Sequence, residues 1–333
     1  MAKIHGISGS TQYLLNGTKA INGKKLASLD DVAHFHSNYE VILAETEITV
    51  QRQLDEIILG LNNDEERLNN QIREGIAYRT TEVDGNINEI NTRINTSRNV
   101  FKILGYKVQY WVAVSLRSRR IHSPFSHVVR EVQNVQSRKT GLISNKQYVI
   151  QNECKKVIDN QKFITENISF LIGAQGEELV IQALSQLSDD FHVLNDINLH
   201  FRRAIHWRER NEYIKTCQID HLVVGPTGIF LVETKNWKIS DIELKSDKLI
   251  WQVRRSSLAL WYYLKDYYWK GGNPKIRTVI VSMHGSFSGQ RLDKYIDVIA
   301  PYQLCRYITS RKNILSEEAV KKIIQIIPCH ISN

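Results

Sequence analysis

The sequence predicts an α+β or α/β protein in two parts, a long helical module followed by a domain in which helices cover a sheet. The first proline is Pro124, and a long helix tolerates such a proline-free run because proline removes a backbone donor and clashes with the preceding turn. After about residue 172 the apolar pattern alternates between strand-like and helix-like periods, which is typical of a covered sheet. We therefore expect a helical coiled-coil assembly or sensor module over residues 1–171 and an α/β domain over residues 172–333.

An apolar repeat of eleven residues runs through the first part. Its groups begin at Val50, Leu61, Ile72, Val83 and Ile94. Eleven residues over three turns give about 3.67 residues per turn, so the apolar positions form a nearly straight stripe on one helix. We expect that helix to extend from about residue 39 to residue 110. A single helix cannot bury such a stripe, and it needs a partner from its own chain or from another copy.

A second apolar series, over residues 128–168, has steps of mostly three, four or seven and predicts a helix that folds back on the first. The basic segment 117–124 would form the turn of this coiled-coil hairpin. The turn is either simply solvated or a contact for a phosphate or a lipid headgroup. Two helices leave much of the stripe uncovered, so we expect a homo-oligomer held by the N-terminal helices.

Charge and composition narrow the class of protein. There are 44 Lys and Arg residues against 35 Asp and Glu, a net charge of +9 at pH 7. On charge alone, a polyanionic partner such as nucleic acid and a basic surface kept for solubility explain this excess equally well. No apolar stretch is long enough for a transmembrane helix, and the first residues do not resemble a signal peptide. No pair of cysteines has the spacing of zinc ligands. We expect a cytoplasmic protein without structural zinc.

The elements of the second part follow from local patterns. Strands are expected at 191–199, 217–224, 228–235, 276–283 and 296–299, and helices at 177–187, 252–268 and 316–327. The residues GPTG at 225–228 separate two apolar runs, and proline and glycine stand where a tight turn requires them. These two runs are therefore expected to form a hairpin.

Two acids stand at the far ends of the hairpin strands. Side chains alternate along a strand, so Asp220 shares a face with apolar residues of the first strand, and Glu233 and Lys235 share a face on the second. Pairing would bring Asp220 close to Glu233, where the two carboxylates repel unless a divalent cation lies between them. Lys235 would orient a water and stabilise charge on a phosphate. This set suits hydrolysis of phosphodiester bonds with Mg²⁺ or Mn²⁺.

A third acid stands upstream of the hairpin, in the segment GAQGEE at residues 173–178. At helical spacing Glu177 shares the apolar face with Val180 and Leu184, whereas Glu178 lies on the polar face. We assign Glu177 to the site, as a catalytic acid close enough to help hold the metal. The alternative is an acid that interacts favourably with the helix dipole.

Basic residues just before the hairpin are candidates for contacts with nucleic acid. Five of them lie in a segment expected to be a loop, namely Arg202, Arg203, Arg208, Arg210 and Lys215. A further candidate is the polar residue Gln218, two positions before Asp220. Such residues contact phosphates and fix the position of the strand. The alternative is a solvated loop.

Four motifs, GxxGE, QIDH, GPTGIF and VETKNW, resemble the NERD (nuclease-related domain) family, which is similar to the PD-(D/E)xK superfamily with its restriction-endonuclease-like fold. The resemblance covers about residues 172–330 and is best over 173–237. It implies that Glu177 is the helix acid, that Asp220 and Glu233 are the metal acids, and that Lys235 is the catalytic lysine. The helix start common after this core has no match at residues 253–258, and the first 170 residues match no family known to us.

The sequence therefore predicts a metal-dependent nuclease, with DNA endonuclease as the favoured activity. A role in antiviral defence follows only by analogy. One alternative is a nucleic-acid-binding scaffold in which the nuclease site is idle. The other is a coiled-coil or membrane-peripheral protein, for which the apolar stretch 101–116 and the following RSRR are the supporting feature. A protein or membrane partner at the helical hairpin belongs to that alternative.

Overall fold

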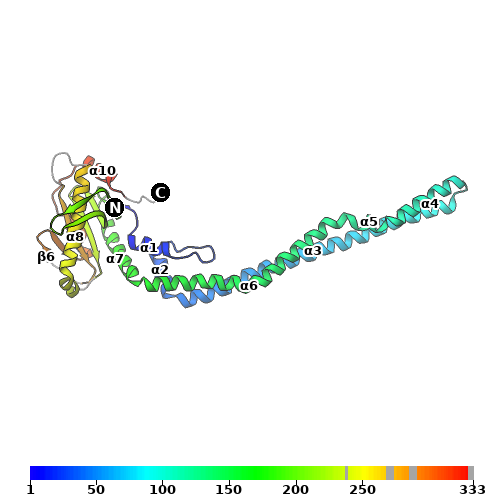
Figure 1. Cartoon of the computed structure of the whole chain (residues 1–333), viewed down its shortest axis with the longest axis horizontal. Coiled ribbons are helices and arrows are strands. Elements are labelled where there is room, and N and C mark those ends of the chain that lie inside the picture. The colour runs from blue at the N-terminus through cyan, green and yellow to red at the C-terminus, as the bar shows by residue number, and fades with distance from the viewer. Residues whose placement is uncertain (237–238, 268–273, 285–290, 329–333) are drawn as a thin grey trace. The chain divides into compact units, whose positions relative to one another are not determined.

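The computed structural model describes residues 1–236, 239–267, 274–284 and 291–328. The chain divides into two compact units (Figure 1). The first consists of Met1–Tyr39 together with Ile158–Asn333, and the second is Glu40–Val157. The sequence had set one boundary between residues 171 and 172, with everything before it in the helical module. In the structure the helical unit is instead an insertion between two segments of the first unit.

A mixed sheet forms the centre of the first unit. Its strands within the described residues are β1 (Lys3–His5), β2 (His192–Trp207), β3 (Glu212–Gly225), β4 (Gly228–Lys235), β5 (Ile276–Ser282), β6 (Arg291–Asp293) and β7 (Ile296–Ile299). Their order is β1-β2-β3-β4-β5-β7-β6. The pairs β2–β3, β3–β4 and β6–β7 are antiparallel, and the pairs β1–β2, β4–β5 and β5–β7 are parallel. The α+β layout expected from the sequence is therefore present.

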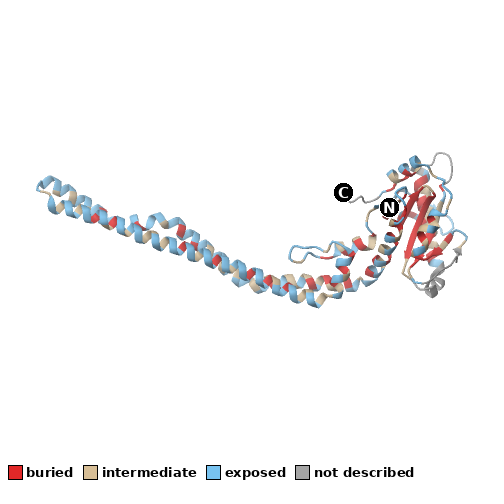
Figure 2. Cartoon of the chain, turned by 180° about the vertical axis from the view of Figure 1, so that it is seen from behind, coloured by how far each residue is buried: buried red, intermediate tan, exposed pale blue. Residues whose placement is uncertain are grey.

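Helices cover both faces of this sheet. On one face α7 (Ile168–Ser185) and α9 (Leu304–Thr309) pack against Val223 and Val232. On the other, α8 (Ile239–Tyr267) and α10 (Glu317–Ile326) pack against Leu222 and Leu231. Since consecutive side chains of a strand point to opposite faces, central strands covered on both sides are apolar along most of their length. The strands are accordingly mostly buried (Figure 2).

The N-terminal segment belongs to the first unit, which the sequence did not predict. It supplies β1 and the helices α1 (Gly9–Gly17) and α2 (Leu29–Ser37). Leu14 is fully buried, and the ring of Tyr13 stacks on Phe170 at 4.5 Å between centroids. The backbone of Lys19 exchanges two hydrogen bonds with the Asn160 side chain, at 2.7 and 2.9 Å. These contacts attach α1 and the residues after it to α7 and to the end of the preceding helix.

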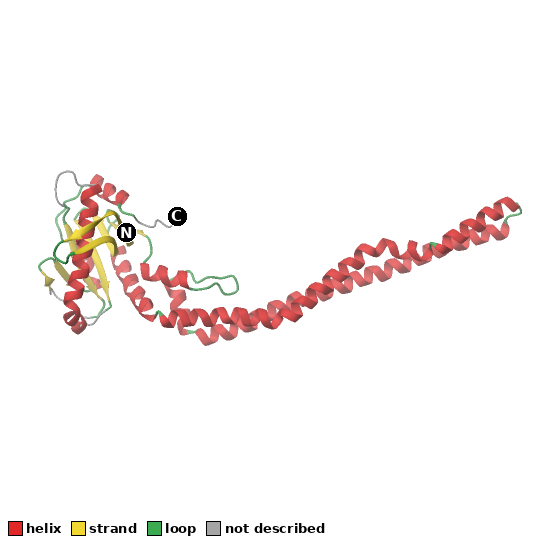
Figure 3. Ribbon diagram, viewed as in Figure 1, coloured by secondary structure: helices red, strands yellow, loops and turns green. Residues whose placement is uncertain are grey.

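Two long helices, α3 (Tyr39–Thr96) and α6 (Ser126–Glu166), dominate the second unit (Figure 3). Between them lie α4 (Val100–Ser115), α5 (Arg117–His122) and the 3-10 turn η1 (Ser123–Phe125). The buried positions of α3 within this unit follow the eleven-residue repeat, with Ile57 as an exposed exception, and are Thr46, Val50, Leu54, Leu61, Leu68, Val83 and Ile87. Val50 and Leu54 pack on Ile150 of α6. Because later residues of α3 pack on earlier residues of the returning arm, the two arms are antiparallel.

The chain reverses at residues 97–99, and the expectation of a turn at 117–124 was wrong. Asp84 of α3 pairs with Arg117 at 2.5 Å, so the basic segment lies along the returning arm. Asn99 caps α4 by accepting a hydrogen bond from the Phe101 backbone N–H at 3.0 Å, which begins a new helix directly after the reversal. Pro124 stands at the start of the 3-10 turn, where its missing N–H is tolerated.

The length and hydropathy of these helices decide whether any of them could cross a membrane. α4 is rich in apolar residues but has only 16 residues, fewer than the roughly 20 needed to cross a bilayer. Within the part of the chain that the structure describes, no helix combines the length and the apolar character that a membrane span requires.

We expect substitutions in α6 to distinguish buried from exposed apolar positions. Ile150→Ala should lower the free energy of unfolding of the second unit by about 2–5 kcal/mol, because it leaves a cavity beside Val50 and Leu54. Ile143→Ala, on the same helix but 54% exposed, should change it by no more than about 0.5 kcal/mol. Urea unfolding followed by circular dichroism measures both. Equal effects would contradict the observed packing.

Candidate active site

The β3–β4 hairpin brings Asp220 and Glu233 to neighbouring places on two strands. Gly225 and Gly228 form the pair beside the turn, and Gly228 has φ of 135°, a conformation that other residues rarely adopt. The pairing continues to His221 opposite Val232, and one further step sets Asp220 beside Glu233. The Thr234 backbone N–H donates to Asp220 Oδ2 at 3.1 Å. The turn therefore fixes the distance between the two acids.

Glu233 is 2% exposed and is held by two donors. Lys235 Nζ and Gln252 Nε2 both donate to its Oε1, at 2.7 and 2.6 Å. Burial and the neighbouring Asp220 charge raise the pKa of Glu233 to about 7. Burial alone would lower the pKa of Lys235, but the nearby carboxylates outweigh it and the pKa is raised. The ammonium is therefore charged at neutral pH and lies beside the acid pair.

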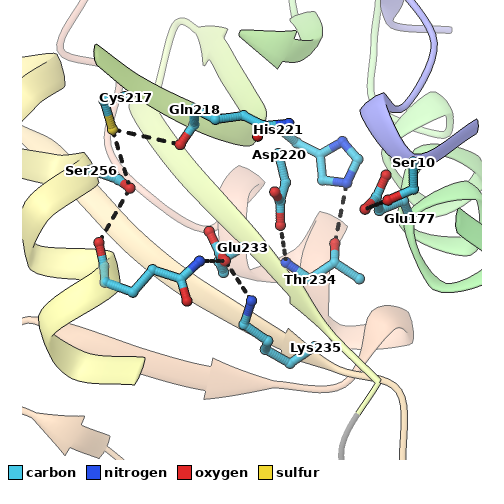
Figure 4. A network of polar contacts seen from close by, with 11 residues as sticks. Ser10, Glu177, Cys217, Gln218, Asp220, His221, Glu233, Thr234, Lys235 and Ser256 are labelled. Carbon is cyan, nitrogen blue, oxygen red and sulfur yellow. Dashed lines mark hydrogen bonds and ion pairs between the residues drawn. The ribbon is translucent and has the colours of Figure 1, made fainter. Parts of the chain in front are cut away.

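Asp220 and Glu177 complete the acidic group (Figure 4). Burial raises the pKa of Asp220, and the Lys235 charge and the Thr234 N–H oppose this. Burial, followed by the Asp220 charge, raises the pKa of Glu177. Glu177 belongs to α7, which covers the opposite face of the sheet from α8. Its carboxylate accepts a hydrogen bond from the Ser10 hydroxyl at 2.8 Å, and it reaches the pair through its charge.

Two residues at this site were missed in the sequence. Gln252 lies in α8, three residues after the buried Leu249 and four before the buried Ser256. A glutamine at that spacing, on the side of the helix that also carries Leu249 and Ser256, was a usable signal. Ser10 gave none, because its contact with Glu177 joins residues that are 167 positions apart. Glu178, expected to face solvent, is half-buried like Glu177.

A buried chain of hydrogen-bonded polar groups, which we call the buried polar chain, lies on the other face of β3 and β4 from the acid pair. It contains His221. The imidazole Nδ1–H donates to Asn195 Oδ1 at 2.8 Å, and Nε2 accepts from the Thr234 hydroxyl at 3.2 Å. Asn195 Nδ2 in turn donates to the Gly6 carbonyl at 3.0 Å. Complete burial lowers the pKa of His221 to about 3, so the ring stays neutral. His221 therefore stabilises β3 and β4 and points away from the acid pair.

The candidate contacts for nucleic acid lie on a longer hairpin than expected. The segment interpreted as a loop is mostly strand, since β2 continues to Trp207 and β3 begins at Glu212. All six of the side chains are exposed, namely those of Arg202, Arg203, Arg208, Arg210, Lys215 and Gln218. The Arg210 guanidinium lies over the Trp251 ring at 4.5 Å. Gln218 Nε2 donates to Asp196 Oδ1 at 2.7 Å, so its amide already has a partner.

The acid pair offers the oxygen ligands that a divalent cation such as Mg²⁺ prefers. Among the residues that the structure describes, no group of three or more His, Cys, Asp or Glu side chains is arranged to hold a metal ion. Mg²⁺, however, is commonly held by one or two carboxylates, with waters and substrate phosphates as the other ligands. Asp220 and Glu233 supply two carboxylates that repel each other. This pair fits such an ion.

Comparison with known proteins concerns the same part of the chain. Residues 172–283 match the family described as NERD, nuclease-related domain, and that range contains Glu177, Asp220, Glu233 and Lys235. The N-terminal half has no family match. A stretch of 67 residues is 39% identical to an uncharacterized protein of Bacillus anthracis, and it covers 20% of this chain and 27% of that relative. The chain thus spans about a quarter of the relative's length. No solved structure matches the chain. The family match indicates a nuclease-related function.

We expect the buried polar chain to be necessary for stability. His221→Leu leaves the Asn195 amide oxygen and the Thr234 hydroxyl without partners, which should cost about 1–3 kcal/mol for each group. The matched variant His200→Leu, at an exposed position of β2, should change the free energy of unfolding by about 0.5 kcal/mol at most. Urea denaturation provides the values. A His221→Leu protein as stable as the wild type would refute the assignment.

Proposed function

We propose that this chain is a metal-dependent nuclease that hydrolyses phosphodiester bonds in DNA. The observation that carries the proposal is the pair of the half-buried Asp220 and the buried Glu233 with the Lys235 ammonium beside it, in a part of the chain that matches a nuclease-related family. A restriction-endonuclease-like fold for this part is the corresponding structural proposal. The mixed sheet with helices on both faces supports it.

Asp220 and Glu233 would hold Mg²⁺ or Mn²⁺, with Glu177 assisting through its charge or a water. A cation relieves the repulsion that raises the pKa of Glu233. Once bound, such an ion supplies Lewis acidity and an activated water.

The remaining side chains of the site would orient the Glu233 carboxylate and stabilise charge on the phosphate. Gln252 and Lys235 bind the same oxygen of Glu233, which fixes the carboxylate and leaves its other oxygen, Oε2, for further contacts. The Lys235 side chain is 16% exposed, so its ammonium lies at the edge of the buried region. There it would stabilise negative charge that develops on the phosphate. The exposed basic side chains of the β2–β3 hairpin would contact the backbone of the nucleic acid.

The second unit would assemble copies of the chain as a coiled-coil hairpin. Ile87 and Ile90 belong to the apolar repeat of α3, but they pack against the returning arm within the chain. They are therefore not available for contacts between copies. Ile48 and Leu59 of α3 are 56% and 59% exposed and are better candidates for an oligomer interface. A role in antiviral defence rests on analogy with regulated nucleases. Light scattering of the intact protein measures the mass.

Cleavage of supercoiled plasmid DNA by the full-length protein tests the function. We expect cleavage with Mg²⁺ or Mn²⁺ and none with EDTA. Asp220→Asn and Glu233→Gln should reduce the rate at least about 100-fold, as expected when charge stabilisation in a water-excluded site is lost. The control Glu178→Gln should cleave like the wild type. Wild-type rates in either acid variant would refute the site, and DNA binding without cleavage under every metal would favour the idle scaffold.

Lys235→Met tests the role of the ammonium, because it keeps the length of the side chain and removes its charge. We expect the cleavage rate at saturating DNA to fall much more than the affinity for DNA, since the interaction is made in the transition state. Single-turnover cleavage and filter binding give the two quantities. An equal loss in both would make Lys235 a ground-state phosphate contact.

A further inference from the structure

The outer side of α4 carries a stripe of large apolar side chains that are mostly exposed to solvent. Phe101, Leu104, Val108 and Trp111 follow each other in steps of three and four, and so share one side of the helix. They are 87%, 64%, 58% and 70% exposed. The opposite side, represented by Tyr110 and Ala113, packs against Val83 and Ile87 of α3. α4 therefore has one apolar face inside the helix pair and a second one in solvent.

The charged side chains of the segment that carries this stripe are all of one sign. No Asp or Glu occurs from residue 97 to residue 130. The exposed basic side chains of the first part of this segment are Arg98, Lys102, Lys107, Arg117, Arg119 and Arg120. Arg117 is paired with Asp84 of α3. Such an excess of positive charge disfavours contact between the same surfaces of two copies and favours an anionic partner.

We propose that the outer stripe of α4 docks on the surface of an anionic lipid bilayer. An interfacial helix typically combines Trp, Phe and Leu on one side with Lys and Arg around it, as α4 does. Its phenylalanine and tryptophan suit the region between headgroups and acyl chains. Since no helix among the described residues is able to span a membrane, the stripe would lie in the plane of the interface. The basic side chains would then contact lipid phosphates.

Flotation with vesicles tests this, using the full-length protein and two lipid mixtures. Vesicles of phosphatidylcholine with phosphatidylglycerol should carry the protein to the top of the gradient, and vesicles of phosphatidylcholine alone should carry at least about tenfold less. Added salt should weaken the association because it screens the charges. Equal binding to both mixtures, or binding to neither, would overturn the proposal.

Variants separate the stripe from other exposed apolar side chains. The triple variant Phe101→Ser, Leu104→Ser, Trp111→Ser should lose at least about tenfold in binding to the anionic vesicles, because the apolar area that enters the interface is removed. The charge variant Arg119→Glu, Arg120→Glu should lose a similar factor. The control Tyr78→Ser, Tyr148→Ser removes side chains that are 71% and 69% exposed on α3 and α6, and it should bind like the wild type.

Two further measurements distinguish lipid binding by the stripe from contact between copies of the chain and from the proposed nuclease activity. If the triple variant binds vesicles like the wild type but has a lower mass in light scattering, the stripe joins copies of the chain and the lipid proposal is wrong. Plasmid cleavage without vesicles should be the same for the wild type and the triple variant. A failure of vesicle binding therefore leaves the proposed nuclease site untouched, and a failure of cleavage leaves the lipid proposal untouched.

Discussion

The carboxylates of Asp220 and Glu233 lie side by side on β3 and β4. Burial raises the pKa of both, and the Asp220 charge raises the pKa of Glu233 further. Several elements of the first unit position groups around this pair of carboxylates. The β3–β4 turn fixes its register, α8 brings Gln252 to Glu233, and α7 brings a third charge, that of Glu177. The Lys235 ammonium partly neutralises the group. Charged groups of this kind cost free energy when buried unless they are paired or bind a cation, so the arrangement indicates a function beyond stability.

The sequence predicted those parts of the fold that depend on local signals. β4 and β7 have the expected bounds, and the GPTG turn was sufficient to set Asp220 beside Glu233. Contacts between distant segments were not predictable in this way. β1, α1 and Ser10 join the first unit through residues more than 150 positions away. The reversal was misassigned because RSRR and Pro124 gave a stronger turn signal than the single cap of Asn99.

Segments on both sides of the inserted helical unit contribute to the site. Because Glu40–Val157 is an insertion, the segment that precedes it returns to the first unit and supplies Ser10 to Glu177. The same segment supplies the Gly6 carbonyl to the polar chain that contains His221 and Thr234. The residues before the insertion thus contribute to the surroundings of the acids that follow it. A domain taken from residue 172 onward would lack both contacts.

Binding of Mn²⁺ in the absence of nucleic acid tests most directly whether the acid pair holds a cation. Isothermal titration calorimetry and electron paramagnetic resonance of the full-length protein provide independent readouts that need no catalysis. The account predicts that Mn²⁺ binds to the wild type and to Glu178→Gln, and that Asp220→Asn combined with Glu233→Gln removes the binding while the circular dichroism spectrum is unchanged. Equal Mn²⁺ binding by the double variant and the wild type would contradict it.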